Sequence, residues 1–141
     1  MWFRDVLFDL AFEHMTKRTW LLYAGDTLLL AALTLVGFAT HGEADLSFLP
    51  RMAVLFFPLT ISWFLLAPAL GLFDGKIASD PKQLWRPALG MVFAAPLAAV
   101  LRGFFLSTPV IPIFAAVLAG TSALGMVIWR AIYFFLNRRS P

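Results

Sequence analysis

The pattern of apolar and polar positions divides the chain into four long apolar runs separated by short polar connections. The runs cover residues 20–40, 52–73, 84–106 and 110–136. A helix of about twenty residues rises about 30 Å, which matches the thickness of a bilayer core. The pattern therefore predicts an all-α integral membrane bundle of four transmembrane helices, formed by residues 19–137 as one domain.

The residues before the first apolar run are too polar to cross a membrane. On a helical wheel Asp5, Asp9 and Glu13 fall in one arc, and apolar side chains cover much of the remainder. This distribution predicts a short amphipathic segment, residues 1–18, that lies in the membrane interface; a partly ordered tail is the alternative. Acidic residues at these positions are atypical of a cleaved signal peptide, so we expect the first span to remain in the mature protein. Residues 138–141 form a basic tail.

The composition supports a membrane protein and argues against several classes of enzyme. The chain has 141 residues, of which 61% are hydrophobic and 13% charged, and it contains no cysteine. A soluble domain of this size could not hide so much apolar surface. The sequence contains no phosphate-binding glycine loop, nucleophile elbow or HExxH motif. We therefore expect a protein that is not an enzyme and that holds neither a cofactor nor a metal ion.

The basic residues predict the orientation of the chain. Of the 11 Lys and Arg residues, all but three fall on one side of the predicted spans. These are Arg4, Lys17, Arg18, Lys76, Lys82, Arg86, Arg138 and Arg139. The positive-inside rule then places both termini in the cytoplasm and the protein in the cell (inner) membrane. Because the charges flank apolar runs, they indicate contact with the lipid bilayer and not with nucleic acid; a homo-oligomer or a larger membrane complex remains open.

Two charged residues lie inside the predicted spans at matching depth. Asp26 follows Trp20 by six positions and Arg130 precedes Leu136 by six, so both lie about 9 Å inside the cytoplasmic boundary. A lone carboxylate costs roughly 2.5–3.5 kcal/mol at the centre of a span. Arg130 also shares a helix face with small side chains, where membrane helices approach closely, so we expect the charges to point into the bundle. We therefore predict an intramembrane ion pair, Asp26–Arg130, which either fixes the register of the helices or handles protons.

Arg102 lies near the outer end of the third span, at a depth that does not match Asp26. We expect it to turn toward an outer-end polar cluster formed with His41, Glu43 and Asp45, as an interfacial anchor. An anion site at Arg102, or a cation site at the three cluster residues, is an alternative.

Polar side chains at mid-depth indicate a possible cavity. Thr60, Ser62 and Trp63 lie on the second span, and Tyr23 lies on the first. These four residues could line a cavity, although packing and hydrogen bonds to the helix backbone are the alternative.

Four short motifs carry a resemblance to a known family. They are Ala24-Gly25-Asp26, Thr40-His41-Gly42-Glu43, Leu101-Arg102-Gly103 and Trp129-Arg130. With them the chain resembles an uncharacterised family of small bacterial and archaeal four-span membrane proteins, catalogued as domain of unknown function 3054. The resemblance covers roughly residues 21–133 and implies a four-span fold without implying an activity. The family often has a basic residue shortly before the His turn, where this chain has Phe38-Ala39, so the resemblance implies no anion site there.

Three functional hypotheses follow. The leading one is a non-enzymatic structural or accessory subunit, or a small homo-oligomer. A compact proton-coupled small-molecule transporter is the second, because small four-span exporters resemble this chain in size and in carrying an acid, here Asp26, on the first span. A lipid- or pigment-binding module that uses Phe56, Phe57, Trp63 and Phe64 is the third.

Overall fold

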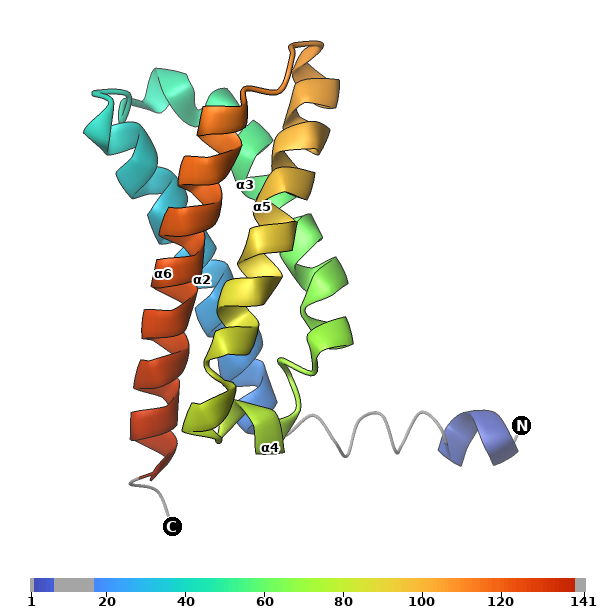
Figure 1. Cartoon of the computed structure of the whole chain (residues 1–141). Coiled ribbons are helices and arrows are strands. Elements are labelled where there is room, and N and C mark those ends of the chain that lie inside the picture. The colour runs from blue at the N-terminus through green and yellow to red at the C-terminus, as the bar shows by residue number, and fades with distance from the viewer. Residues whose placement is uncertain (1, 7–16, 139–141) are drawn as a thin grey trace.

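The computed structural model describes residues 2–6 and 17–138 and consists of long helices that run up and down (Figure 1). Within these residues there is no strand, and four helices are long and apolar enough to cross a membrane. The predicted all-α membrane bundle is therefore confirmed. The helices are α2 (Lys17–Thr40), α3 (Leu49–Leu66), α5 (Trp85–Leu106) and α6 (Pro112–Arg138).

The four helices form a closed ring. α2 packs on α3, α3 on α5, α5 on α6, and α6 returns to α2. The buried face of α5 is built from small residues, which lets its neighbours approach closely. Its small residues are Gly90, Ala94, Ala95, Ala98, Ala99 and Gly103, and Pro87 and Met91 are buried with them. Large apolar side chains such as Leu28, Phe93 and Phe104 are exposed on the outside of the ring. An apolar outside is what a bilayer requires.

Short elements connect the helices at the two ends of the bundle. The α2–α3 connection contains η1 (Leu46–Phe48), and the α3–α5 connection contains η2 (Pro68–Leu70), α4 (Gly75–Ala78) and η3 (Pro81–Gln83). The end that holds α4, the start of α2 and the end of α6 is called the basic end below (Figure 1). The opposite end, with the α2–α3 connection and the turn at residues 107–111, is called the turn end.

The second apolar run is not helical to residue 73 as predicted. α3 ends at Leu66, because Pro68 lacks the N–H that an α-helix would bond to the carbonyl four residues earlier. Gly71 then takes a left-handed conformation, with φ 69°, which ends the 3-10 turn. The backbone between α3 and α4 is therefore not α-helical, and the carbonyl oxygens of Leu70 and Leu72 accept hydrogen bonds from side chains.

The structure describes only part of the predicted N-terminal segment, residues 1–18. Residues 2–6 are helical, with Trp2 and Phe3 exposed. The remainder of the predicted interfacial segment, residues 7–16, lies outside the described residues, as does the tail from residue 139 onward.

Candidate functional site

The side chain of Asp26 is completely buried, with 0% of its surface exposed, and it is paired with Arg130. The Nε of Arg130 donates to Oδ1 of Asp26 at 3.1 Å, and Nη2 donates to Oδ2 at 2.7 Å. This bidentate arrangement is the strong geometry for an arginine and a carboxylate. The equal depths of Asp26 and Arg130 predicted a contact between α2 and α6, and the structure contains this contact.

Two tryptophans complete the environment of the carboxylate. The Nε1 of Trp63, on α3, donates to Oδ2 at 2.9 Å, and the Nε1 of Trp129, on α6, donates to Oδ1 at 2.8 Å. Each oxygen of Asp26 thus accepts two hydrogen bonds, which fills the roughly four acceptor positions of a carboxylate. Neither indole was predicted as a partner of Asp26. Trp63, Trp129, Arg130 and Asp26 are together called the Asp26 centre.

The non-helical segment after α3 supplies the remaining partners of Arg130. Nη1 of Arg130 donates to the carbonyl oxygen of Leu72 at 2.6 Å, and the guanidinium lies over the ring of Phe73, 5.5 Å from its centroid. A second arginine uses the same segment, because Nη1 of Arg86 donates to the carbonyl oxygen of Leu70 at 2.8 Å. The break in the helix therefore exposes backbone acceptors that two arginines satisfy.

Glycines make room for both indoles. A Cβ atom at Gly25 would lie 1.9 Å from Cζ2 of Trp129, and one at Gly90 would lie 2.9 Å from Cζ3 of Trp63. Real Cβ atoms do not come so close to other atoms, so any side chain at these positions would displace the ring. The indoles occupy space that only glycine leaves free.

The Asp26 centre balances one negative and one positive charge inside the bundle. The carboxylate is enclosed, because its side chain has no exposed surface and each of its oxygen atoms accepts two hydrogen bonds. Arg130 is similarly enclosed, with 2% of its surface exposed. Chemically, the arrangement is suited to holding α2, α3 and α6 at one depth.

The match to known proteins covers this centre. A family model described as "Protein of unknown function (DUF3054)" matches residues 23–133. The chain belongs to this family. No curated protein and no solved structure matches the chain. The DUF3054 match includes all four residues of the Asp26 centre and Arg102, and it leaves out residues 1–22.

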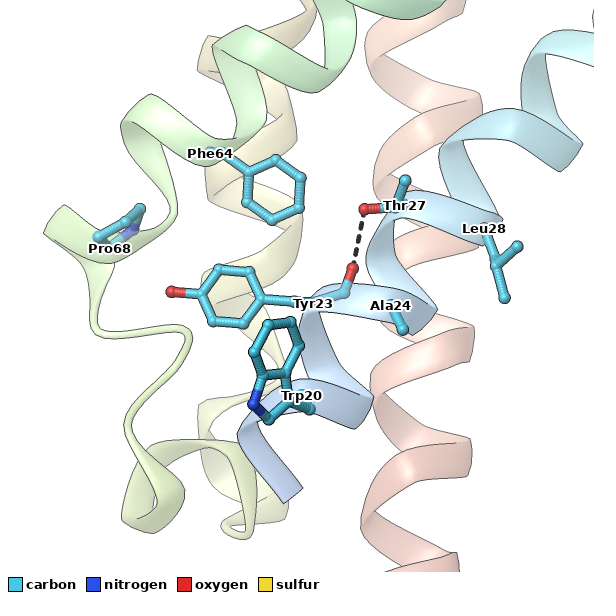
Figure 2. A pocket seen from close by; sticks show the side chains of 7 residues that line it. All are labelled: Trp20, Tyr23, Ala24, Thr27, Leu28, Phe64 and Pro68. Carbon is cyan, nitrogen blue, oxygen red and sulfur yellow. Dashed lines mark hydrogen bonds between the residues drawn. The ribbon is translucent and has the colours of Figure 1, made fainter. Parts of the chain in front are cut away.

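A groove lies between α2 and the end of α3 (Figure 2). Tyr23 projects across it, and its ring stacks on Phe73 with 4.1 Å between centroids and on Phe64 with 5.6 Å. The lining is mostly apolar and consists of Trp20, Tyr23, Ala24, Thr27, Leu28, Phe64 and Pro68.

The structure separates the four predicted cavity residues. Tyr23 alone of these four lines the groove, whereas Trp63 binds Asp26. Ser62 is fully buried and Thr60 is half-buried, and neither hydroxyl has a hydrogen-bond partner. Of the residues in the lipid- or pigment-binding hypothesis, Phe64 lines the groove.

The predicted outer-end polar cluster is not formed. No hydrogen bond or ion pair joins Arg102 to His41, Glu43 or Asp45, all of which the structure describes. Asp45 instead accepts a hydrogen bond from the N–H of Leu46 at 2.7 Å and so caps η1. The reason is spatial, because the α2–α3 connection and the α5–α6 turn lie at opposite sides of the turn end (Figure 1). Within the described part of the chain, no three His, Asp or Glu side chains are grouped to hold a metal ion.

Proposed function

We propose that this DUF3054 protein is a non-enzymatic multi-pass protein of the cell inner membrane, working as a structural or accessory subunit or as a homo-oligomer. The observation that carries this proposal is the complete use of the intramembrane carboxylate within the chain itself. Asp26 accepts four hydrogen bonds from α3 and α6, and Arg130 reaches on to the segment before α4. One buried centre thus joins three helices and a connection.

The same geometry argues against proton-coupled transport through Asp26. A transporter that exchanges a proton at this carboxylate needs a free oxygen atom and a water path to it. Here both oxygen atoms are fully bonded and the side chain has no exposed surface. A buried ion pair that satisfies all its partners is better suited to fixing helix positions.

The distribution of charge supports an orientation with both termini in the cytoplasm. The basic end carries Lys76, Lys82, Arg86 and Arg138, while Arg51 lies at the turn end. Short basic connections stay on the cytoplasmic side during insertion. The basic end is therefore the cytoplasmic one in this proposal.

The decisive experiment removes each charge of the pair alone and both together. Asp26→Asn and Arg130→Gln each break a buried pair, so each should lower the free energy of unfolding by about 3–5 kcal/mol. The double variant should be little worse than either single variant, because the two losses belong to one interaction. Thermal unfolding in detergent gives the comparison. Asp5→Asn and Arg138→Gln, at exposed positions of the described chain, are the matched controls and should melt like the wild type.

Transport is measured on the same proteins in liposomes. Wild type and Asp26→Asn should give the same proton flux under an imposed pH gradient. An Asp26→Asn protein that melts like the wild type and has lost a pH-driven flux would overturn the proposal and establish the transporter.

A further inference from the structure

Arg102 is a charged side chain within a membrane span. No residue of the described chain forms a hydrogen bond or an ion pair with it. It lies on α5, four positions before the last helical residue, Leu106, and hence about 6 Å below that end. Its Nε is buried and has no hydrogen-bond partner. Asp26 is fully engaged with other donors and lies toward the opposite end of the bundle, so it cannot neutralise Arg102.

The guanidinium of Arg102 contacts an aromatic ring. Arg102 lies over the ring of Phe114, on α6, at 5.0 Å from its centroid. A ring face attracts a cation and fixes the plane of the guanidinium, but it accepts none of the five N–H hydrogen bonds that arginine offers. The side chain is therefore positioned without being neutralised.

The surroundings place Arg102 at the border between apolar and polar regions. The adjacent residue, Gly103, accepts a hydrogen bond from the N–H of Thr108 at 3.0 Å, so the α5–α6 turn folds back onto the end of α5. On the last turn of α5, Phe104 and Phe105 are 82% and 66% exposed and face the surroundings of the bundle. Long cationic side chains at such a depth extend toward the headgroup region.

We propose that Arg102 binds a phosphate oxyanion at the turn end of the bundle. A phosphate group matches the fork of N–H donors with two parallel charge-assisted hydrogen bonds. The source is either the headgroup of a phospholipid or free phosphate. The proposal is independent of the role of the Asp26 centre, because it uses other residues at the other end of the bundle.

The test compares the full-length wild type with Arg102→Gln, Arg102→Lys and Arg51→Gln, each purified in mild detergent. Native mass spectrometry reports retained phospholipid. Thermal unfolding of delipidated protein is then followed in two arms, one with phosphatidylglycerol in micelles and one with inorganic phosphate. Arg51→Gln is the matched control, because Arg51 is an exposed arginine at the same end of the bundle.

We expect the wild type and Arg51→Gln to retain phospholipid and to be stabilised by added phosphatidylglycerol, and Arg102→Gln to show neither effect. Arg102→Lys keeps the charge but loses the fork, so its apparent affinity should fall about tenfold, or 1.4 kcal/mol. Stabilisation by phosphatidylglycerol alone assigns the site to lipid, whereas stabilisation by both probes assigns it to any phosphate.

Delipidated Arg102→Gln should be at least as stable as delipidated wild type, since the change removes a charge that has no partner. No lipid retention and no stabilisation of the wild type in either arm would overturn the proposal. An equal loss of binding in Arg51→Gln would also overturn the proposal, because such a loss would show that any arginine at the turn end attracts the phosphate by its charge alone. A wild-type dimer that Arg102→Gln converts to a monomer without any change in bound phosphate would instead assign Arg102 to a carboxylate of a second copy.

Discussion

At the scale of residues, two pairs of sequence neighbours meet as one unit. Asp26 binds Arg130, while the preceding residue on each helix, Gly25 and Trp129, fits against its counterpart. The indole of Trp129 also returns to Asp26 through its N–H group. The glycine thus determines whether Trp129 can reach the carboxylate, and the charged pair depends on a residue that carries no charge.

Substitution of Gly25 tests this dependence. In Gly25→Ala the new Cβ would lie 1.9 Å from the indole of Trp129, so the ring must move and its hydrogen bond to Asp26 is lost. Overpacking of this kind costs about 1–3 kcal/mol, and the free energy of unfolding should fall by at least that much. Thermal unfolding in detergent measures the change.

The control is Gly37→Ala on the same helix. A Cβ at Gly37 meets nothing within 4 Å, so this change should leave stability unaltered or raise it by up to about 1 kcal/mol through helix propensity. Equal effects of the two substitutions would show that the contact between Gly25 and Trp129 contributes no stability.

The sequence predicted the ion pair but not its other partners, for a physical reason. Depth along a span follows from the rise per residue, so Asp26 and Arg130 could be matched by counting. Whether Trp63 reaches Asp26 depends on the rotation of α3 about its own axis and on the gap left by Gly90, which counting does not supply. Burial of an indole N–H at mid-span was the available signal, since such a group needs an acceptor.

At the scale of elements, the break after α3 places the carbonyl group of Leu72 and the ring of Phe73 against Arg130. The apolar run predicted a span that continues to residue 73. Hydropathy reflects the free energy of moving side chains into lipid, and it carries no information about the hydrogen bonds of the backbone. Pro68 and Gly71 were the signals of the break. Irregular backbone within a membrane is tolerated where protein groups satisfy its carbonyls. Arg86 and Arg130 do this for Leu70 and Leu72.

Phe73 tests the contribution of this segment. Its ring lies between the guanidinium of Arg130 and the ring of Tyr23, with centroid distances of 5.5 Å and 4.1 Å. A cation–π contact and an aromatic pair each contribute about 0.5–2 kcal/mol, so Phe73→Leu should lower the free energy of unfolding by about 1–3 kcal/mol. Phe93→Leu, at an exposed position of α5, should change it by less than about 0.5 kcal/mol. Wild-type stability of Phe73→Leu in thermal unfolding would contradict the role assigned to this segment.

At the scale of the whole molecule, α2 and α6 pack together more closely toward the basic end. Asp26, Trp63 and Arg130 are buried toward the basic end, whereas Gly37 on α2 and Ala116 on α6 are exposed near the turn end. Four apolar runs joined by short connections were enough to predict the up-and-down order. The looser turn end was not predictable, because stripes of small residues continue along the helices beyond the region where they pack. The same looseness separates Arg102 from the acids of the α2–α3 connection.

The orientation of the bundle can be measured directly, because the chain contains no cysteine. Ser79 lies at the basic end, just after α4, and Thr108 lies in the exposed turn at the other end. In intact cells a membrane-impermeant maleimide should label Thr108→Cys and should leave Ser79→Cys unlabelled until the membrane is permeabilised. This result is expected because the basic connections remain in the cytoplasm.

The reverse labelling pattern would contradict the proposed orientation and would move the phosphate site at Arg102 to the inner leaflet. The Asp26 centre would then lie nearer the outer leaflet, but its internal hydrogen bonds would be unchanged. Orientation and the role of the centre are therefore tested separately, and each can fail without the other.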